Sequence, residues 1–290
     1  LEKEERTVRR LRKAYLEITN VCNLACDFCP GTRRVPGFLS PEGFRTLAGR
    51  LRPHTDYLYL HLMGEPLLHP QLGVLLEEAD ALGFRVMLTT NGTLLRQREA
   101  LLLGSPAVEK VSVSVHSFEG NGGAAIGPYN RENLELLRAA AGAGKRCALR
   151  LWNLDGAETE GANRQNGQIL SRLREAFPGP WRSDRRGTTL APGIYLEFGE
   201  KFQWPDLSAP EEEGRRFCYG LRDQVGVLWD GTVVPCCLDH EGDVPLGNLY
   251  ETSLEEILSG PRAAAIYHGF SQGEAREALC RRCAFTRRFQ

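Results

Sequence analysis

The sequence lacks a run of eighteen apolar residues, a marked excess of one charge, and an opening segment with the features of an export signal. Without such a run we expect no membrane-spanning helix. Lys and Arg number 36 against 37 Asp and Glu, which leaves a net charge of −1. A chain so balanced has no general surface for nucleic acid or another polyanion. We therefore expect a cytoplasmic protein that binds neither membranes nor nucleic acid.

Low-complexity segments and short internal repeats are also absent from the 290 residues. A chain of this length can bury one large core and a smaller second one. The change of pattern along the sequence predicts three parts. These are a charged lead-in over residues 1–13, a large domain over residues 14–200, and a linker with a small domain over residues 201–290.

Cysteine is present in an unusual arrangement. The sequence has nine cysteines and no export signal, which favours metal ligands over disulfides. Three form a C-x3-C-x2-C pattern near the front (Cys22, Cys26 and Cys29), and five gather near the end (Cys218, Cys236, Cys237, Cys280 and Cys283). Cys147 stands alone in an apolar strand, and we interpret it as a core residue.

The front pattern is typical of an iron–sulfur cluster with one open position. Three thiolates in one short loop can hold three corners of a cubane cluster, which leaves one iron free to bind another molecule. A zinc knuckle or plain buried thiols are the alternatives, although zinc sites usually show two C-x2-C pairs. With Phe28 in its aromatic position, the loop resembles the C-x3-C-x-aromatic-C signature of the radical S-adenosylmethionine (radical SAM) superfamily.

Strand and helix patterns alternate from residue 14 to residue 200. Strands are predicted at 14–19, 57–62, 85–89, 110–116, 147–152 and 193–198. Helices are predicted at 41–51, 69–82, 94–103, 131–143 and 164–176. Six repeats predict an α/β domain whose parallel sheet curls toward a barrel, since a full barrel needs eight units. The resemblance likewise implies a partial (β/α)6 TIM-like barrel.

Polar residues follow several strands, at the end where an α/β barrel carries its chemistry. Met63-Gly64-Glu65 resembles the family's G-G-E motif, with a methionine in place of the first glycine. This turn would accept hydrogen bonds from the amine of S-adenosylmethionine (SAM), and Arg150 would bind the SAM carboxylate. The SAM-binding set that the resemblance implies is Phe28, Met63, Gly64, Glu65, Asn91, Ser114, Arg150 and Leu151.

Several of these residues also fit plainer interpretations. Ser112, Ser114 and His116 share one face of their strand, which we expect to face the barrel interior. Ser114 or His116 would then reach the ribose of SAM, or both belong to a polar core layer. Asn91 equally fits a turn residue, and Arg150 fits a surface ion pair.

The strand–helix alternation stops near residue 200. Asp230-Gly231 predicts a hairpin between strands at 224–229 and 232–235. The region resembles the SPASM/twitch extension of radical SAM enzymes, a small α+β iron–sulfur domain. The resemblance implies an auxiliary 4Fe–4S cluster, and a four-cysteine zinc site is the alternative. The expected ligands of the auxiliary cluster are Cys218, Cys236, Cys280 and Cys283.

Only one of two adjacent cysteines is expected to be a ligand of the auxiliary cluster. Neighbouring residues on a strand point to opposite faces, so Cys236 and Cys237 cannot both face it. The resemblance favours Cys236.

The resemblance implies a radical SAM oxidoreductase with two 4Fe–4S clusters. It would cleave SAM reductively to a 5′-deoxyadenosyl radical, which takes a hydrogen atom from a substrate C–H bond. A rear cluster with four ligands would accept an electron in a two-electron oxidation. Lys201, Asp239 and His240 are candidate proton acceptors. We expect a small polar metabolite or a ribosomal peptide as substrate, and flavodoxin or ferredoxin as electron donor.

Two other functions stay open. A MoaA-like cyclase shares the two-cluster layout, although that family ends in Gly-Gly and this sequence ends in Arg-Arg-Phe-Gln. A non-catalytic iron–sulfur electron carrier would not need an open front cluster. The short segment before Cys22 has no room for a leader-binding domain, which favours a metabolite over a peptide.

Overall fold

The computed structural model describes residues 10–117, 126–154, 165–184 and 187–289. Most of the predicted lead-in, residues 1–9, therefore lies outside the described residues. The division of the chain at residues 13 and 200 stays a prediction. None of the helices in the described ranges has the length and apolar character needed to cross a membrane.

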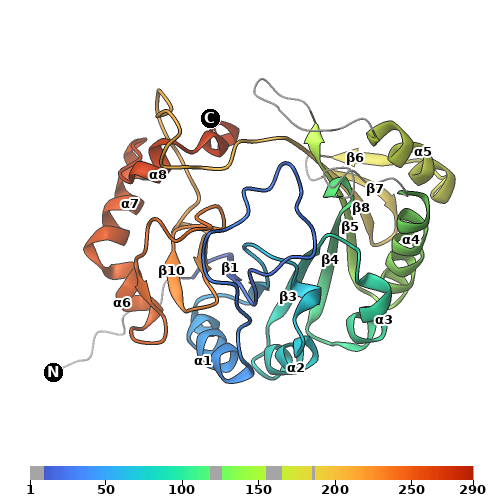
Figure 1. Cartoon of the computed structure of the whole chain (residues 1–290), viewed down its shortest axis with the longest axis horizontal. Coiled ribbons are helices and arrows are strands. Elements are labelled where there is room, and N and C mark those ends of the chain that lie inside the picture. Colours follow the sequence, from blue (N-terminus) through green and yellow to red (C-terminus); the bar gives the residue numbers. More distant parts are fainter. Residues whose placement is uncertain (1–9, 118–125, 155–164, 185–186, 290) are drawn as a thin grey trace.

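A curved sheet with helices on its outer side forms the body of the protein (Figure 1). The main strands are β1 (Lys13–Leu16), β2 (Tyr57–Tyr59), β3 (Arg85–Thr90), β4 (Val108–Ser114), β5 (Arg146–Leu154) and β8 (Ile194–Glu200). Each pairs in parallel with the next. The α/β fold with a partial barrel is thus confirmed.

Helices follow the strands along the outer side of the sheet. They are α1 (Pro41–Leu51), α2 (Leu72–Ala81), α3 (Leu95–Gly104), α4 (Ile126–Gly142) and α5 (Asn166–Ala176). Short 3-10 turns lie at η1 (Arg52–His54), η2 (Pro66–Leu68) and η4 (Ala284–Phe289). Ser40 begins α1, since its hydroxyl accepts a hydrogen bond from the Gly43 N–H at 3.1 Å.

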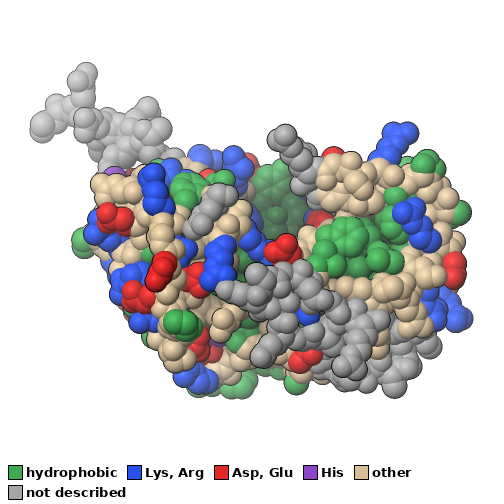
Figure 2. Space-filling view, turned by 90° about the horizontal axis from the view of Figure 1, so that it is seen from above, with side chains coloured by type: hydrophobic (Ala, Val, Ile, Leu, Met, Phe, Trp, Pro, Cys, Tyr) green, Lys and Arg blue, Asp and Glu red, His purple; other side chains and the backbone are tan. Residues whose placement is uncertain are grey.

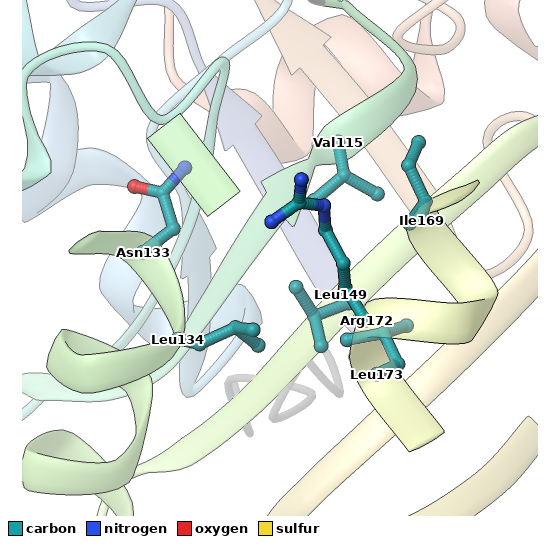
Figure 3. A pocket seen from close by; sticks show the side chains of 7 residues that line it. All are labelled: Val115, Asn133, Leu134, Leu149, Ile169, Arg172 and Leu173. Atoms are coloured by element: carbon teal, nitrogen blue, oxygen red, sulfur yellow. The ribbon is translucent and has the colours of Figure 1, made fainter. Parts of the chain in front are cut away.

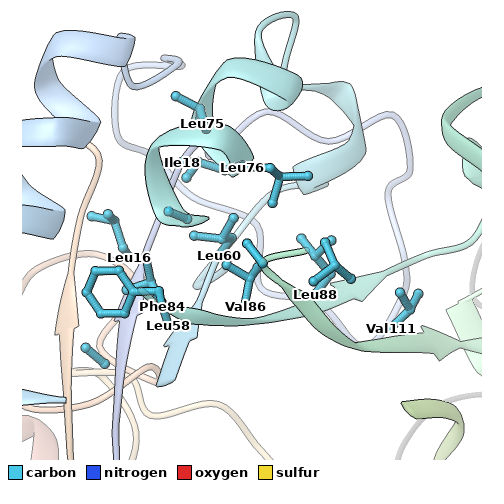
Figure 4. Packing of buried hydrophobic residues seen from close by; sticks show 14 of the residues in the cluster. Leu16, Ile18, Leu58, Leu60, Leu75, Leu76, Phe84, Val86, Leu88 and Val111 are labelled. Carbon is cyan, nitrogen blue, oxygen red and sulfur yellow. The ribbon is translucent and has the colours of Figure 1, made fainter. Parts of the chain in front are cut away.

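The main core lies between the sheet and these helices. Figure 4 shows Leu60, which follows β2, and Val86 of β3 beneath Leu75 and Leu76 of α2, with Leu58 of β2 in the same cluster. All five are at most 1% exposed. Burying such a side chain contributes about 1.5–3 kcal/mol, so this layer fixes the shape of the barrel.

The C-terminal part adds strands to the same sheet. β9 (Gln224–Val227) pairs in parallel with β1, and β10 (Thr232–Val234) pairs antiparallel with β9 as the Asp-Gly hairpin predicts. β11 (Gly247–Asn248) forms the edge, and helices α6 (Leu254–Ser259), α7 (Pro261–Gln272) and α8 (Ala278–Arg281) lie beyond it. The sequence did not predict that β9 continues the barrel sheet.

An antiparallel pair at the opposite edge was also not predicted. β6 (Arg182–Asp184) and β7 (Gly187–Ala191) precede β8, and β7 pairs antiparallel with β8. The strand order of the described sheet is β11-β10-β9-β1-β2-β3-β4-β5-β8-β7-β6. The face seen in Figure 2 has acidic and basic side chains interspersed, in line with the balanced composition.

Candidate active site between two groups of cysteines

One cavity of about 1550 Å³ reaches both groups of cysteines. Ordinary small-molecule sites measure about 300–1,000 Å³, so this cavity has room for a cofactor and a substrate together. Its walls come from residues of β1, β2, β3, β4 and β5, from the front cysteine loop and from the C-terminal segment. The cysteines that line it are Cys22, Cys26, Cys29, Cys218, Cys236, Cys237 and Cys283.

A second cavity is too small for a ligand. It measures about 10 Å³ and lies between β4, β5, α4 and α5, with Asn133 and Arg172 directed toward it (Figure 3). A space of that size holds about one water molecule. The larger cavity is therefore the candidate active site.

The loop that carries the front cysteines is closed at its base. Thr19 Oγ1 donates to the Gly37 carbonyl oxygen at 2.8 Å. The Asn20 side chain accepts from the Gly37 N–H at 2.8 Å and donates to the Val35 carbonyl oxygen at 3.0 Å. These bonds tie the returning segment to the end of β1, so the loop stays at the mouth of the sheet.

The three front thiols line the cavity from at least partly exposed positions. Asn91 Nδ2 donates to Cys22 Sγ at 3.9 Å, and the Cys26 thiol donates to the Ser117 carbonyl oxygen at 3.7 Å. Burial raises the pKa of Cys22 and of Cys29. A thiol of that kind loses its proton when a metal binds. This donor set fits three corners of a cubane cluster.

Gly64 allows the end of β2 to pass against the backbone just before the cysteine loop. Its φ is +74°, and a Cβ atom there would lie 2.5 Å from the Thr19 carbonyl oxygen and 2.8 Å from that of Val21. The next residue, Glu65, donates its N–H to the Val21 carbonyl oxygen at 2.8 Å. The turn thus fixes the distance between the second strand and the front loop.

Replacing Gly64 with Ala is expected to lower the free energy of unfolding by more than about 2 kcal/mol. The left-handed backbone alone disfavours a Cβ atom by about 1–2 kcal/mol, and the contact with Thr19 adds to this. Urea denaturation measures the change. The control is Gly49→Ala in α1, where a Cβ atom meets nothing within 4 Å. That change should stabilise by about 0.5–1 kcal/mol, and equal losses in both variants would contradict the role of Gly64.

Glu65 joins the ends of β2 and β3. It is 1% exposed and accepts hydrogen bonds from the Thr90 hydroxyl at 2.7 Å, the Asn91 N–H at 2.7 Å and the Leu67 N–H at 3.0 Å. An ionised carboxylate has about four acceptor positions, so one remains for a ligand. Burial raises the pKa of Glu65. In the described structure, Glu65 stabilises the turn after β2 through these three hydrogen bonds.

Six of the eight residues predicted to bind SAM line the cavity: Phe28, Gly64, Glu65, Asn91, Ser114 and Arg150. Met63 is 6% exposed, Leu151 is fully buried, and neither lines the cavity. On β5 the alternation of side chains directs Arg150 and Trp152 to the cavity and Leu151 to the core. The side chains of Met63 and Leu151 are therefore not in a position to meet a ligand in the cavity.

His116 and Trp152 complete this wall. The sequence suggested His116 as an alternative to Ser114 for the ribose of SAM, whereas it gave no indication of Trp152. The Phe28 and His116 rings lie 4.8 Å apart, and His116 Nδ1 is 3.0 Å from the Arg150 carbonyl oxygen. The Arg150 guanidinium lies 3.8 Å from the centre of the Trp152 ring. Burial lowers the pKa of His116 to about 4, so its ring is neutral at pH 7.

The rear thiols converge on one another. Burial raises the pKa of Cys236 well above its usual value, and the nearby thiols of Cys218, Cys237, Cys283 and Cys280 raise it further. Burial raises the pKa of Cys283 to about 12. Thiols gathered in this way ionise together only when a metal supplies positive charge, which fits a metal-binding donor set. Within the described ranges, no three His, Cys, Asp or Glu side chains are spaced for a single metal ion.

Cys237 has different neighbours from Cys236. The Tyr15 hydroxyl forms a hydrogen bond with the Cys237 thiol, and Lys13 and Arg150 are its nearest positive charges. Cys236 interacts with Cys218, Cys280 and Cys283, and with Cys237 itself. The two adjacent cysteines thus belong to different surroundings.

The three predicted proton acceptors are separated by the structure. Asp239 is 2% exposed, does not line the cavity, and accepts the N–H groups of Asp243 at 2.8 Å and Val244 at 3.0 Å. It stabilises a turn. Lys201 and His240 line the cavity, and the His240 ring packs edge-on against Trp204 at 5.4 Å.

A buried ion pair that the sequence did not reveal links the two halves of the site. Glu17, which directly follows β1, is fully buried and binds Arg34 of the front loop through two hydrogen bonds of 2.8 and 2.6 Å. Its carboxylate also accepts the N–H groups of Met63 and Trp229 at 3.3 Å each. Arg34 Nε donates to the His240 carbonyl oxygen at 2.7 Å. The pair therefore connects the front loop, the Gly64 turn and the C-terminal hairpin.

Family models match both parts of this site. A model of the radical SAM superfamily matches residues 16–160, which is 145 of the 290 residues. The chain belongs to the radical SAM superfamily. A model described as the SPASM iron-sulfur cluster-binding domain matches residues 218–284. Within the superfamily the chain thus carries a SPASM domain, and its cofactors are SAM and 4Fe–4S clusters.

Solved structures share the fold over nearly the whole chain. BtrN in complex with AdoMet and 2-DOIA aligns with a TM-score of 0.59 at 15% identity, over 96% of this chain and 94% of that one. Streptococcus suis SuiB bound to precursor peptide SuiA aligns with a TM-score of 0.61 at 12% identity, over 94% of this chain and 76% of that one. At such identities the likeness shows the fold alone.

Curated relatives are similar over a shorter stretch. A GTP 3′,8-cyclase of Synechococcus sp. (strain WH7803) is 37% identical over 120 residues, which cover 36% of this chain and 33% of that protein. The chain spans between 26% and 37% of the length of the curated relatives that it matches.

Proposed function

We propose that this chain cleaves SAM reductively and uses the product radical to oxidise a substrate at an unactivated C–H bond. The observation that supports this most is the single cavity lined by the front thiols and by the rear thiols. SAM bound at a reduced open cluster supplies a 5′-deoxyadenosyl radical, which abstracts a hydrogen atom. The chain's own residues bind, orient and shield the reactants.

In this proposal Cys22, Cys26 and Cys29 hold the front cluster. The SAM amine lies by the turn of Gly64 and Glu65, where backbone carbonyls and the remaining acceptor position of the carboxylate are available. Ser114 and Arg150 are register neighbours on β4 and β5. We therefore place Ser114 beside Arg150 at the SAM carboxylate, and not at the ribose that the sequence suggested for it. Asn91 donates toward Cys22 and so helps to orient the front loop.

Phe28 lies beside His116 at the same mouth and offers an apolar surface for the adenine ring. The backbone of Met63 leads into the Gly64 turn, and the backbone of Leu151 follows Arg150 on β5. These two residues support the site through their main chain, because their side chains are buried in the core.

The rear cluster is assigned to Cys218, Cys236, Cys280 and Cys283. Four protein ligands leave no open iron, so we infer that this cluster accepts the electron that remains after hydrogen abstraction. The proton released in that step needs an acceptor in the cavity. Lys201 and His240 are the predicted acceptors that line it.

Replacing Cys236 with Ala is expected to remove about four iron atoms per chain, whereas Cys237→Ala keeps about eight. The physical reason is that Cys236 interacts with the three other rear thiols, while Cys237 bonds Tyr15. Iron analysis after anaerobic reconstitution measures the difference. Loss of iron in Cys237→Ala, with full iron in Cys236→Ala, would reverse the assignment.

Two relatives in fold were solved with a second molecule bound, and they suggest two substrate classes. BtrN was solved with 2-DOIA and SuiB with a precursor peptide. A small polar metabolite or a ribosomal peptide fits a cavity of about 1550 Å³ beside the cofactor. A flavodoxin or ferredoxin is the proposed electron donor.

The assay that tests the proposal uses anaerobically reconstituted protein with dithionite and SAM. We expect 5′-deoxyadenosine and methionine in equal amounts. Protein that carries about eight iron atoms and forms no 5′-deoxyadenosine would contradict the proposal.

A cyclase is the second candidate, favoured by the 37% identity to a GTP 3′,8-cyclase over 120 residues. Adding GTP to the same assay separates the two functions. A cyclised product formed from GTP would establish the cyclase, and unchanged GTP would leave the oxidation as the function.

A further inference from the structure

Lys13 places a positive charge inside the cavity, at the start of β1. It opens β1, lines the cavity, and its Nζ donates to the Tyr15 hydroxyl at 2.9 Å. The ammonium also lies 5.0 Å from the centre of the Tyr15 ring and 5.1 Å from that of Tyr59. An ammonium has three donors, and the described contacts use one of them.

Acidic residues near Lys13 are engaged elsewhere. Asp223 pairs with Arg12 at 3.3 Å, and Glu197 pairs with Lys110. Asp206, farther along the cavity, accepts from the Ser208 N–H at 2.7 Å and from the Ser208 hydroxyl. Among the described residues, none forms an ion pair with Lys13. Cys237 and Asp223 are the acidic groups that act on the Lys13 ammonium, and neither is a carboxylate paired directly with it.

Neutral polar groups surround the same space. The rings of Tyr15 and Tyr59 lie 4.9 Å apart, and the His61 ring lies 5.5 Å from Tyr15 and 5.9 Å from Tyr59. His61 Nδ1 and Arg150 Nε are buried atoms without a hydrogen-bond partner. All of these residues line the cavity. The His61 and Arg150 nitrogen atoms without a partner thus lie in the same part of the cavity as the Lys13 ammonium.

A desolvated cation without a partner is unfavourable, and so is an unsatisfied buried donor. An anionic group of a ligand would pair with the Lys13 ammonium and accept charge-assisted hydrogen bonds from the unpartnered groups beside it. The SAM carboxylate is assigned to Arg150 and Ser114, so it does not serve Lys13. A second anion is needed.

We propose that Lys13, Tyr59 and His61 form a subsite for a carboxylate or phosphate group of the substrate. This subsite, called here the Lys13 subsite, rests on the proposed function in placing SAM and substrate in one cavity. It narrows the substrate to a molecule that carries an anionic group. Tyr15 positions the ammonium by accepting its hydrogen bond.

The test is calorimetric titration of the SAM-loaded, cluster-reconstituted protein at constant ionic strength. The probes are inorganic phosphate and acetate, titrated separately, with acetamide as the uncharged counterpart of acetate. We expect saturable binding of at least one anion and none of acetamide. Tighter binding of phosphate indicates a phosphorylated substrate, and tighter binding of acetate indicates a carboxylate.

The variant Lys13→Met keeps the aliphatic stem and removes the charge, and it should weaken the bound anion at least about tenfold, which is 1.4 kcal/mol. Lys13→Arg should retain binding within about threefold, since it restores the charge. The matched control is Arg10→Met, which removes a charge from a residue that does not line the cavity and whose side chain is 54% exposed and paired with Asp56. It should change the affinity less than about twofold.

Two results would overturn the Lys13 subsite. One is the absence of saturable anion binding to wild-type protein. The other is equal affinity in Lys13→Met and wild type, together with a shifted rear-cluster potential, which would make Lys13 a residue that tunes the cluster. Calorimetry needs no reductant or turnover. Failed SAM cleavage therefore contradicts the proposed function alone, and failed anion binding in protein that cleaves SAM contradicts this subsite alone.

Discussion

Cys29→Ala is expected to lower the rate of 5′-deoxyadenosine formation by at least about 100-fold and the iron content from about eight to about four per chain. Three thiolates are the fewest that hold a cubane with one open iron, and this loop supplies three. Cys29 is exposed, so its replacement leaves the core intact. Iron analysis and the anaerobic SAM-cleavage assay, run on the same sample, measure both effects.

The control for this change is Cys147→Ala. Cys147 is fully buried among the residues of the main core and does not line the cavity. Its replacement should keep full iron and SAM cleavage, with a modest loss of stability of about 1 kcal/mol from the lost packing. Full SAM cleavage in Cys29→Ala would contradict the assignment of the front cluster.

Arg34→Met is expected to destabilise the protein by about 3–5 kcal/mol, because it leaves the fully buried carboxylate of Glu17 without its cation. The carboxylate would keep only the two longer bonds from the Met63 and Trp229 N–H groups. Urea denaturation measures the loss. SAM affinity should fall as well, since the front loop and the Gly64 turn lose their common anchor.

The neighbouring residue provides a matched control. Arg33 has a side chain that is 85% exposed and lies 3.7 Å from Glu241, so Arg33→Met should cost at most about 1 kcal/mol. The double variant Glu17→Leu with Arg34→Met should recover part of the stability, because no buried charge remains. Similar losses in Arg33→Met and Arg34→Met would contradict the structural importance of the pair.

The front site could be predicted from sequence because its chemistry is concentrated in one short segment. Cys22, Cys26 and Cys29 lie within eight residues, and metal ligation dictates both their type and their spacing. The strand–helix alternation predicted the barrel in the same way, since each element carries its own periodicity. The hairpin at Asp230-Gly231 could be predicted as well, since two adjacent residues specify the turn.

Contacts between distant segments could not be predicted. The parallel pairing of β9 with β1 joins residues about 200 positions apart, and no local pattern specifies a partner strand. Glu17 and Arg34 are common charged residues, and only the folded loop brings them together in the core. Lys13 belongs to the charged lead-in that the sequence predicts over residues 1–13. Its position in the cavity depends on the pairing of β1 with β9, which no local pattern specifies.

Electron paramagnetic resonance of the reduced protein, with and without SAM, tests the central claim most directly. The account predicts that SAM changes the spectrum of the cluster that remains in Cys236→Ala, which is the open front cluster. SAM should leave unchanged the spectrum of the cluster that remains in Cys29→Ala. A response to SAM in Cys29→Ala, or none in Cys236→Ala, would contradict an open cluster at the front and a fully ligated one at the rear.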